Sequence, residues 1–193
     1  MNPRYEMHFD FAGYALNDGY YREAVSTVAV SLERFYEFCI ATVCAKIGIP
    51  EDEYNKTWKN ISNQSERQLG AFLFLYLTEN RRACEFAPQK YTELRNKVTH
   101  KGYFPSREET VEYGQWALTF MTKMYAELES SCNNVILQRR FRRSDGLIAE
   151  HAPNGNWVKL MVDTILNGQP RFKFTYEQWL ARIQTNLQQQ YRA

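Results

Sequence analysis

The chain has few of the groups that carry most enzyme chemistry. It contains only three histidines and four cysteines in 193 residues. The cysteines form no CxxC pair, which excludes the common zinc-binding and thioredoxin-like spacings. With so few histidines and no suitably placed carboxylate pair, we expect neither a metal site nor a cofactor. Cys39, Cys44, Cys84 and Cys132 lie mostly in apolar helical patterns, so we expect free thiols in a reducing compartment.

Long hydrophobic runs are also missing. No stretch reaches the length of a membrane span, and residues 1–6 show no basic start followed by an apolar run. We therefore expect a soluble, cytoplasmic protein with no membrane partner. The chain does have 44% hydrophobic residues, enough for a core, and 15% aromatic residues. Rings beyond the needs of a core serve interfaces or stack on nucleic-acid bases, and core and interface use is the commoner of the two.

Alternating strand patterns are absent up to about residue 135. Throughout this segment apolar residues instead recur every three or four positions, as in amphipathic helices. We expect a long helix over 20–47, a shorter one over 51–60, and further helices that begin near Ser65, Pro88 and Ser106. Ser65 and Ser106 each begin a sequence typical of a capping box. The pattern predicts an all-α, up-and-down helical bundle.

The pattern changes after about residue 143. Asp145-Gly146 and 152–155 predict loops, 157–166 predicts a short helix, and 171–174 predicts one extended segment. Thr175 begins another capping-box sequence and, with it, a last helix. We therefore expect a bundle over residues 1–143 and a small, mostly helical C-terminal appendage over 144–193, packed on the bundle.

Charge is spread unevenly although the net charge is only +2. Residues 1–133 carry 15 basic and 18 acidic side chains, whereas residues 134–193 carry 9 basic and 4 acidic ones. Such a basic cluster neutralises phosphates, so we hypothesise that it binds RNA; an equally open alternative is a solvated helix end whose cations complement the helix dipole. The cluster consists of Arg139, Arg140, Arg142 and Arg143 around Phe141.

The segment from Arg95 to His100 combines the two groups that phosphodiester chemistry needs most. An imidazole exchanges protons near neutral pH, and a guanidinium binds a phosphate through two hydrogen bonds. The other two histidines have no arginine five to seven positions before them. On a helix with about 100° per residue, Asn96 shares a face with His100, and Arg95 is offset by about 140° but is long enough to fold back. Arg95, Asn96 and His100 are therefore the candidate catalytic residues.

A purely structural interpretation of the same residues is also open. Arg95 would then pair with a carboxylate such as Glu93 or Glu112, and His100 would cap the end of its own helix without catalysis.

The phrase Leu94-Arg95-Asn96-Lys97-Val98-Thr99-His100-Lys101-Gly102 resembles the Arg-polar-His motif of the HEPN superfamily of helical-bundle proteins. Residues 15–25 are similar to the beginning of the first HEPN helix, and Leu32-Glu33 is similar to its later acidic position. The resemblance covers roughly residues 10–135. It implies a homodimer in which two motifs face each other and form one metal-independent ribonuclease site.

On that resemblance His100 acts as general base or acid on the ribose 2′-hydroxyl, Arg95 binds the phosphate, and Asn96 orients the imidazole or an oxygen. Lys97 and Lys101 beside them are expected to bind RNA. The resemblance also suggests phage defence or a toxin–antitoxin role, with a protein partner such as an antitoxin. A non-catalytic HEPN module that binds RNA, a nucleotide or a protein is the alternative.

Two positions bear on which branch of the family this chain resembles. Toxin-type members often carry a tyrosine two positions after the histidine, but here that position is Gly102 and Tyr103 follows it. Glu33 either joins the site or pairs with Arg34 or a lysine on a solvated face, and the second interpretation is the simpler.

Overall fold

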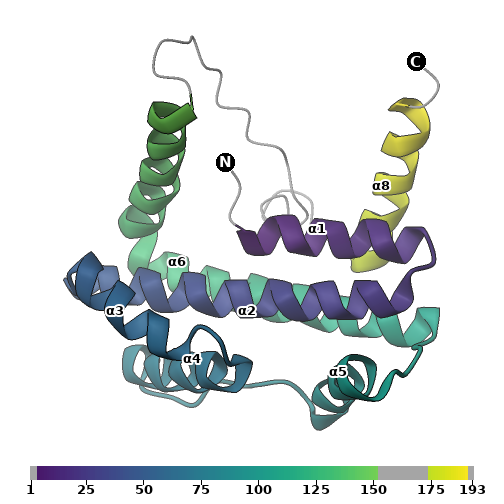
Figure 1. The fold of residues 1–193 in the computed structure, drawn as a ribbon, viewed down its shortest axis with the longest axis horizontal. Coiled ribbons are helices and arrows are strands. Elements are labelled where there is room, and N and C mark those ends of the chain that lie inside the picture. The colour runs from purple at the N-terminus through teal and green to yellow at the C-terminus, as the bar shows by residue number, and fades with distance from the viewer. Residues whose placement is uncertain (1–3, 152–173, 191–193) are drawn as a thin grey trace. The chain divides into compact units, whose positions relative to one another are not determined.

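The computed structural model describes residues 4–151 and 174–190, without the side chains of 137, 139–151 and 186–190. The described residues form seven helices and no strand, so the fold class is all-α, as expected (Figure 1). The up-and-down order of a HEPN bundle stays a prediction. The helices are α1 (Arg4–Asn17), α2 (Tyr21–Lys46), α3 (Glu51–Ile61), α4 (Ser65–Asn80), α5 (Gln89–Lys101), α6 (Arg107–His151) and α8 (Tyr176–Gln190).

Two of the three capping boxes are confirmed. At the beginning of α6 the Ser106 backbone N–H donates to Glu109 at 2.8 Å, and the Glu109 N–H donates to the Ser106 hydroxyl at 3.2 Å. Before α8 the Thr175 N–H donates to the Gln178 side chain at 2.9 Å, and the Gln178 N–H donates back at 3.2 Å. Each pair satisfies two N–H groups that a helix beginning otherwise leaves without partners.

The capping box expected at Ser65 is wrong. The residue that caps α4 is Gln64, and Ser65 is already helical. The Gln68 amide, which would have completed the box, donates instead to the Ser62 carbonyl at 2.6 Å. Gln68 is 1% exposed, so its side chain is held by interior packing rather than by the helix end.

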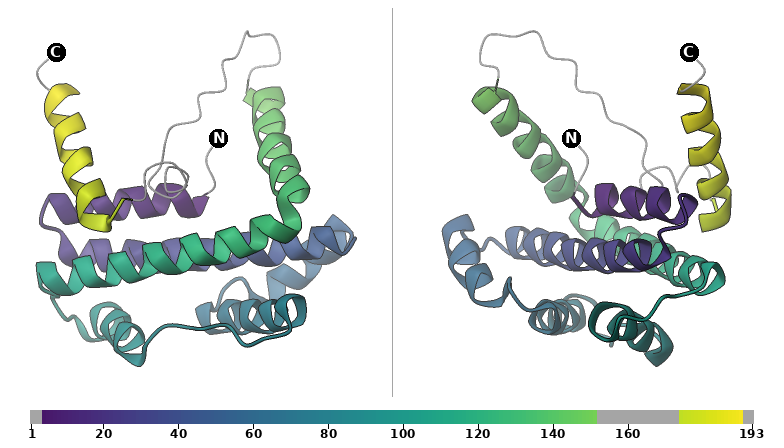
Figure 2. Two further views of the ribbon diagram at one scale, coloured as in Figure 1. Left: turned by 180° about the vertical axis from the view of Figure 1, so that it is seen from behind. Right: turned by 45° about the vertical axis from the view of Figure 1, so that its right-hand side comes forward.

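The long last helix of the expected bundle extends further than the sequence indicated. Its backbone leaves helical geometry at Cys132, with φ −130° and ψ 15°, and α6 turns there before it continues (Figure 2). The loop expected at Asp145-Gly146 is wrong, because α6 runs on to His151. Glycine and aspartate inside a helix each cost only about 1 kcal/mol or less relative to alanine, which the surrounding helix can absorb. The boundary expected after residue 143 thus lies within α6, and the division into domains stays a prediction.

The described residues group into two units by their packing. Unit 1 contains Glu33–Cys84 and the part of α6 from Met124 onward, whereas unit 2 contains Arg4–Leu32, Glu85–Lys123 and α8. Each unit therefore combines segments that are far apart in the sequence. Helices α2 and α6 contribute residues to both.

Unit 2 contains a helix that the sequence analysis did not anticipate. Along α1 the buried residues Tyr5, Phe9, Ala12 and Leu16 recur at helical spacing, and this pattern was the available signal. Helix α1 packs against α8 (Figure 1), where the Phe9 and Tyr176 rings lie 5.3 Å apart. The Asn17 amide donates to the Leu180 carbonyl at 2.9 Å, and the Ser31 hydroxyl of α2 donates to the Tyr5 carbonyl at 2.7 Å. Hydrogen bonds thus support apolar contacts on two sides of α1.

Unit 1 is organised around aromatic contacts between α2 and α4. The Tyr36 and Phe72 rings lie 4.9 Å apart, and the Phe72 and Tyr76 rings 6.2 Å apart. The Arg34 guanidinium donates to Glu37 at 2.7 Å and to Gln68 at 3.3 Å, so a polar network borders this apolar contact.

The remaining expectations for the C-terminal part concern 152–155, 157–166 and 171–173, which lie outside the described residues. The last helix is confirmed as α8. Within 4–151 and 174–190, no helix is long and apolar enough to cross a bilayer.

The contact of α6 with α8 yields a stability prediction. A Cβ atom at Gly114 would lie 2.3 Å from Cε1 of Tyr176, whose side chain is 1% exposed. We expect Gly114→Ala to lower the free energy of unfolding by about 1–3 kcal/mol, because the ring has no room to move. Urea denaturation followed by circular dichroism measures this.

Gly70→Ala on α4 is the matched control, because no atom outside the adjoining residues and backbone of α4 lies within 4 Å of its Cβ position. It should raise stability by about 0.5–1 kcal/mol through helix propensity alone. Equal stability of Gly114→Ala and the unmodified protein would contradict the described packing of α8.

Candidate functional site

Helix α5 is held in unit 2 by one apolar face. Val98 is fully buried, and Tyr91 and Leu94 are each 9% exposed. The Tyr91 ring lies 5.1 Å from Trp116 and 5.9 Å from Tyr113 on α6. Burial of this face fixes the rotation of α5 about its axis and therefore which polar side chains reach solvent.

The C-terminal end of α5 is closed by a left-handed turn at Gly102. Gly102 has φ 65°, a conformation that only glycine adopts at little cost. The N–H groups of Gly102 and Tyr103 both donate to the Lys97 carbonyl. Pro105 is buried, whereas Tyr103 and Phe104 before it are exposed. His100 therefore lies in the last turn of α5, next to an exposed aromatic loop.

Arg95 and Asn96 form a defined pair at the centre of the motif. Both side chains are half-buried, and Arg95 Nη1 donates to Asn96 Oδ1 at 2.9 Å. A guanidinium carries five donors in a planar fork, and this bond orients that fork. Asn96 thus orients Arg95, whereas the resemblance had assigned it to the imidazole or to an oxygen.

The other predicted residues on α5 are exposed. His100, Lys97 and Lys101 all reach the surface, so three basic side chains surround the helix end. The two carboxylates considered as partners of Arg95 are engaged by other groups: Glu93 accepts a hydrogen bond from Gln89 at 2.8 Å, and Glu112 accepts one from Lys90 at 2.7 Å.

Not all predicted site residues come together at this point. Glu33 is half-buried on the part of α2 that belongs to unit 1, whereas the motif belongs to unit 2, so its participation stays an open alternative. The arginine cluster lies on the helical backbone of α6, and the RNA-binding hypothesis for it stays a prediction. Its side chains, those of Arg139, Arg140, Arg142 and Arg143, lie outside the described residues.

An open groove in unit 2 offers a second surface for comparison. It has a volume of about 690 Å³, but its rim carries the carboxylates of Glu108, Glu112 and Glu177. One of them pairs with Arg107 at 3.6 Å. Acidic side chains repel a phosphate backbone, so the basic end of α5 is the better candidate for an anionic substrate. In the described part of the chain, no group of three His, Cys, Asp or Glu side chains could hold a metal ion.

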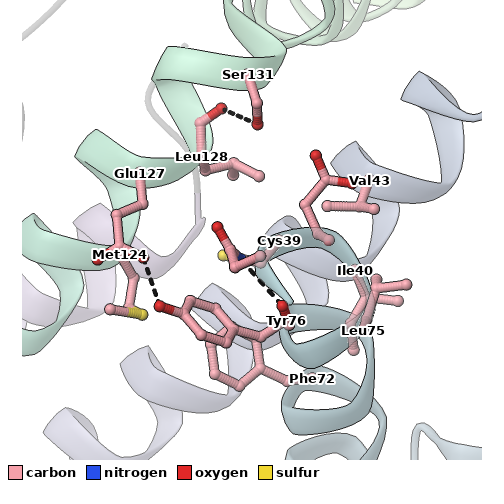
Figure 3. A pocket seen from close by; sticks show the side chains of 12 residues that line it. Cys39, Ile40, Val43, Phe72, Leu75, Tyr76, Met124, Glu127, Leu128 and Ser131 are labelled. Atoms are coloured by element: carbon pink, nitrogen blue, oxygen red, sulfur yellow. Dashed lines mark hydrogen bonds between the residues drawn. The ribbon is translucent and has the colours of Figure 1, made fainter. Parts of the chain in front are cut away.

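Unit 1 contains a polar cluster that the sequence analysis missed (Figure 3). The Tyr76 hydroxyl donates to Glu127 at 2.6 Å, and Arg82 donates to the other oxygen of Glu127 at 2.8 Å. Burial, aided by this hydrogen bond, raises the pKa of Tyr76 to about 12. Burial also raises the pKa of the Cys39 thiol well above its usual value, so Cys39 is a poor nucleophile.

The cavity beside this cluster has a volume of about 30 Å³. Pockets that bind organic ligands are about ten times larger or more, whereas this volume accommodates roughly one water molecule. The cluster is therefore a structural element of unit 1 rather than a substrate site.

No protein-family model, no curated protein and no solved structure matches this chain. Its function therefore has to be inferred from its own residues and their geometry.

The Tyr76 cluster leads to a prediction about pH. In an unfolded chain tyrosine has a pKa of about 10, so the raised pKa in the folded protein favours the protonated hydroxyl. Its contribution to stability is present below about pH 10 and is lost as the pH rises from about 10 towards 12. We expect Tyr76→Phe to cost about 1–2 kcal/mol at pH 7, with a difference that shrinks above pH 10.

Urea denaturation at pH 7, 9 and 10.5 checks this. Tyr20→Phe, at a residue that is 61% exposed, is the control for loss of a surface phenol. A stability difference for Tyr76→Phe that is constant or grows with pH would show that the hydroxyl is not protonated preferentially in the folded state.

Proposed function

We propose that this protein is an endoribonuclease of the HEPN type that acts as a homodimer on RNA. The observation that carries the proposal is the arrangement at the end of α5. A half-buried guanidinium, oriented by Asn96, lies in the same two helical turns as the exposed imidazole of His100. Lys97 and Lys101 extend the positive charge around both groups.

The reaction that suits these groups is attack of a ribose 2′-oxygen on the adjacent phosphorus. The imidazole removes the 2′-hydroxyl proton as the new P–O bond forms, and the P–O5′ bond breaks as the leaving oxygen takes up a proton. The products are a 2′,3′-cyclic phosphate and a free 5′-hydroxyl. Two His100 side chains, one from each copy, would divide the two proton transfers.

Arg95 contributes by stabilising charge on the phosphate oxygens. Negative charge grows on them as the phosphorus becomes five-coordinate, so a cation that is already oriented stabilises the transition state more than the ground state. The bond from Arg95 to Asn96 supplies that orientation. Arg95→Lys would keep the charge but lose the planar fork.

Substitution of His100 tests the proton-transfer role. We expect His100→Ala to reduce cleavage of single-stranded RNA about 100-fold or more, because it removes the general base or acid. The measurement is cleavage of a labelled oligonucleotide in the presence of EDTA, with the cyclic phosphate detected by mass spectrometry. Lys97→Ala is the matched control on the same helix; it should weaken binding but leave the maximal rate nearly unchanged.

The same oligonucleotide with a single 2′-deoxyribose at the cleaved position should resist cleavage, since the nucleophile is gone. Undiminished cleavage by His100→Ala, or cleavage that requires a divalent metal, would contradict the proposal. An absence of cleavage by the unmodified dimer would favour a non-catalytic RNA-binding module.

The proposed dimer leads to a second prediction. If each active site needs two copies of α5, specific activity should rise with protein concentration in parallel with the dimer fraction measured by sedimentation. A specific activity that does not change across the monomer–dimer transition would show that one chain suffices.

A further inference from the structure

Side chains from the beginning of α2 and from the turn before α6 form a surface of unit 2 that the proposed chemistry does not use. Phe104 is 77% exposed, and the Arg22 guanidinium carbon lies 5.8 Å from the centre of its ring. Tyr103, the neighbour of Phe104 in the chain, is 39% exposed. We call Arg22, Tyr103 and Phe104 the aromatic platform.

The platform is held in place by its surroundings rather than by its own burial. Pro105 is buried directly after Phe104, and the Tyr103 hydroxyl donates to Glu109 at 3.0 Å. Glu109 is in turn fixed by the Ser106 capping box at the beginning of α6. Exposed rings on a rigid turn lose little conformational entropy on binding, which suits them to contact a flat partner.

We propose that the aromatic platform binds single-stranded nucleic acid by stacking an unpaired base on the Phe104 ring. This inference rests on the proposed function, because it names the form of RNA that reaches the site. Aromatic rings beside cations are the usual means of binding single strands without reading their sequence. The Arg22 contact covers only part of Phe104, since most of that side chain remains exposed.

The platform lies close to the proposed reaction centre. Phe104 follows His100 by four residues, which span at most about 14 Å of fully extended chain, and the Gly102 turn shortens the path. A strand that places a phosphate at Arg95 and His100 therefore passes Phe104 within a few nucleotides. Stacking one base would hold the neighbouring sugar away from double-helical geometry, so paired RNA should bind poorly.

Charge around the platform is mixed, which limits how it can bind. Asp18 and Glu23 are exposed on either side of Arg22 in the sequence. Stacking should therefore contribute more than attraction for phosphates at this point, while Lys97 and Lys101 account for most of the salt dependence. This dependence on stacking rather than on charge distinguishes the platform from a simple basic patch.

Binding of fluorescein-labelled oligouridylate and of the matching oligodeoxythymidylate, measured by anisotropy with the full-length chain, tests the proposal. We expect Phe104→Ala to weaken both about 5- to 100-fold, whereas Phe104→Trp should bind at least as well as the unmodified protein. Phe74→Ala is the matched control, because Phe74 is 73% exposed on α4 in unit 1. It should leave binding unchanged.

Oligonucleotides that carry one abasic nucleotide show which base stacks on Phe104. When the base that stacks on Phe104 is removed, Phe104→Ala should cause no further loss of binding. The salt dependence of binding should hardly change in Phe104→Ala. Equal binding by Phe104→Ala and the unmodified protein, no binding of either strand, or an equal loss at every abasic position would overturn the proposal.

Two outcomes identify other roles for the same residues. If Phe104→Ala changes the mass measured by light scattering, Phe104 is a contact between copies of the chain, and the platform proposal is wrong. Binding of the uncleavable deoxy strand does not depend on His100 chemistry, so it can succeed where the cleavage assay fails. Failure of the platform and failure of the ribonuclease proposal are therefore distinguishable.

Discussion

The aromatic contact between α5 and α6 is the constraint on which the candidate site depends. The Tyr91 ring stacks on Trp116, and the Trp116 ring stacks on Phe120. Val98 completes the buried face of α5 about one turn before that helix ends. Rotation of α5 about its axis would bury part of its polar edge, and taking a charged side chain out of water costs several kcal/mol. The apolar face therefore determines that Arg95 is half-buried and that His100 is exposed.

A short helix held in this way restrains the residues of the motif to different degrees. Arg95 and Asn96 lie beside the buried face and restrain each other through a hydrogen bond. His100 lies one turn later, at an exposed helix end beside Gly102. In the proposed mechanism the oriented Arg95 would bind the phosphate and the exposed His100 would transfer the proton.

The net charge of +2 is too small to attract nucleic acid through the field of the whole protein. The proposed binding of RNA would then depend on local arrangements of charge. At the end of α5 basic side chains and exposed rings lie within ten residues of sequence, whereas the open groove of unit 2 is lined by several carboxylates. This contrast, rather than groove size, directs the functional interpretation to α5.

Local sequence rules succeeded where the interactions are local. The boxes at Ser106 and Thr175 join residues three positions apart, so their patterns were sufficient. The same rule failed at Ser65, where a buried Gln68 bonds to Ser62 instead. The loop predicted at Asp145-Gly146 was wrong for a related reason, because continuation of a helix depends on the whole segment rather than on two residues.

By itself, the sequence determined the all-α class, most helix boundaries and the presence of one Arg-Asn-His set on a single helix, because helical periodicity and spacing are properties of neighbouring residues. Only the tertiary structure decided that Asn96 orients Arg95 and that the exposed Phe104 ring lies beside Arg22. It also decided that Tyr76 and Glu127, 51 residues apart in the sequence, form a part-buried hydrogen bond. Those outcomes depend on which side chains meet after burial. Contacts between distant segments are selected by packing of the whole unit, and no local pattern encodes them.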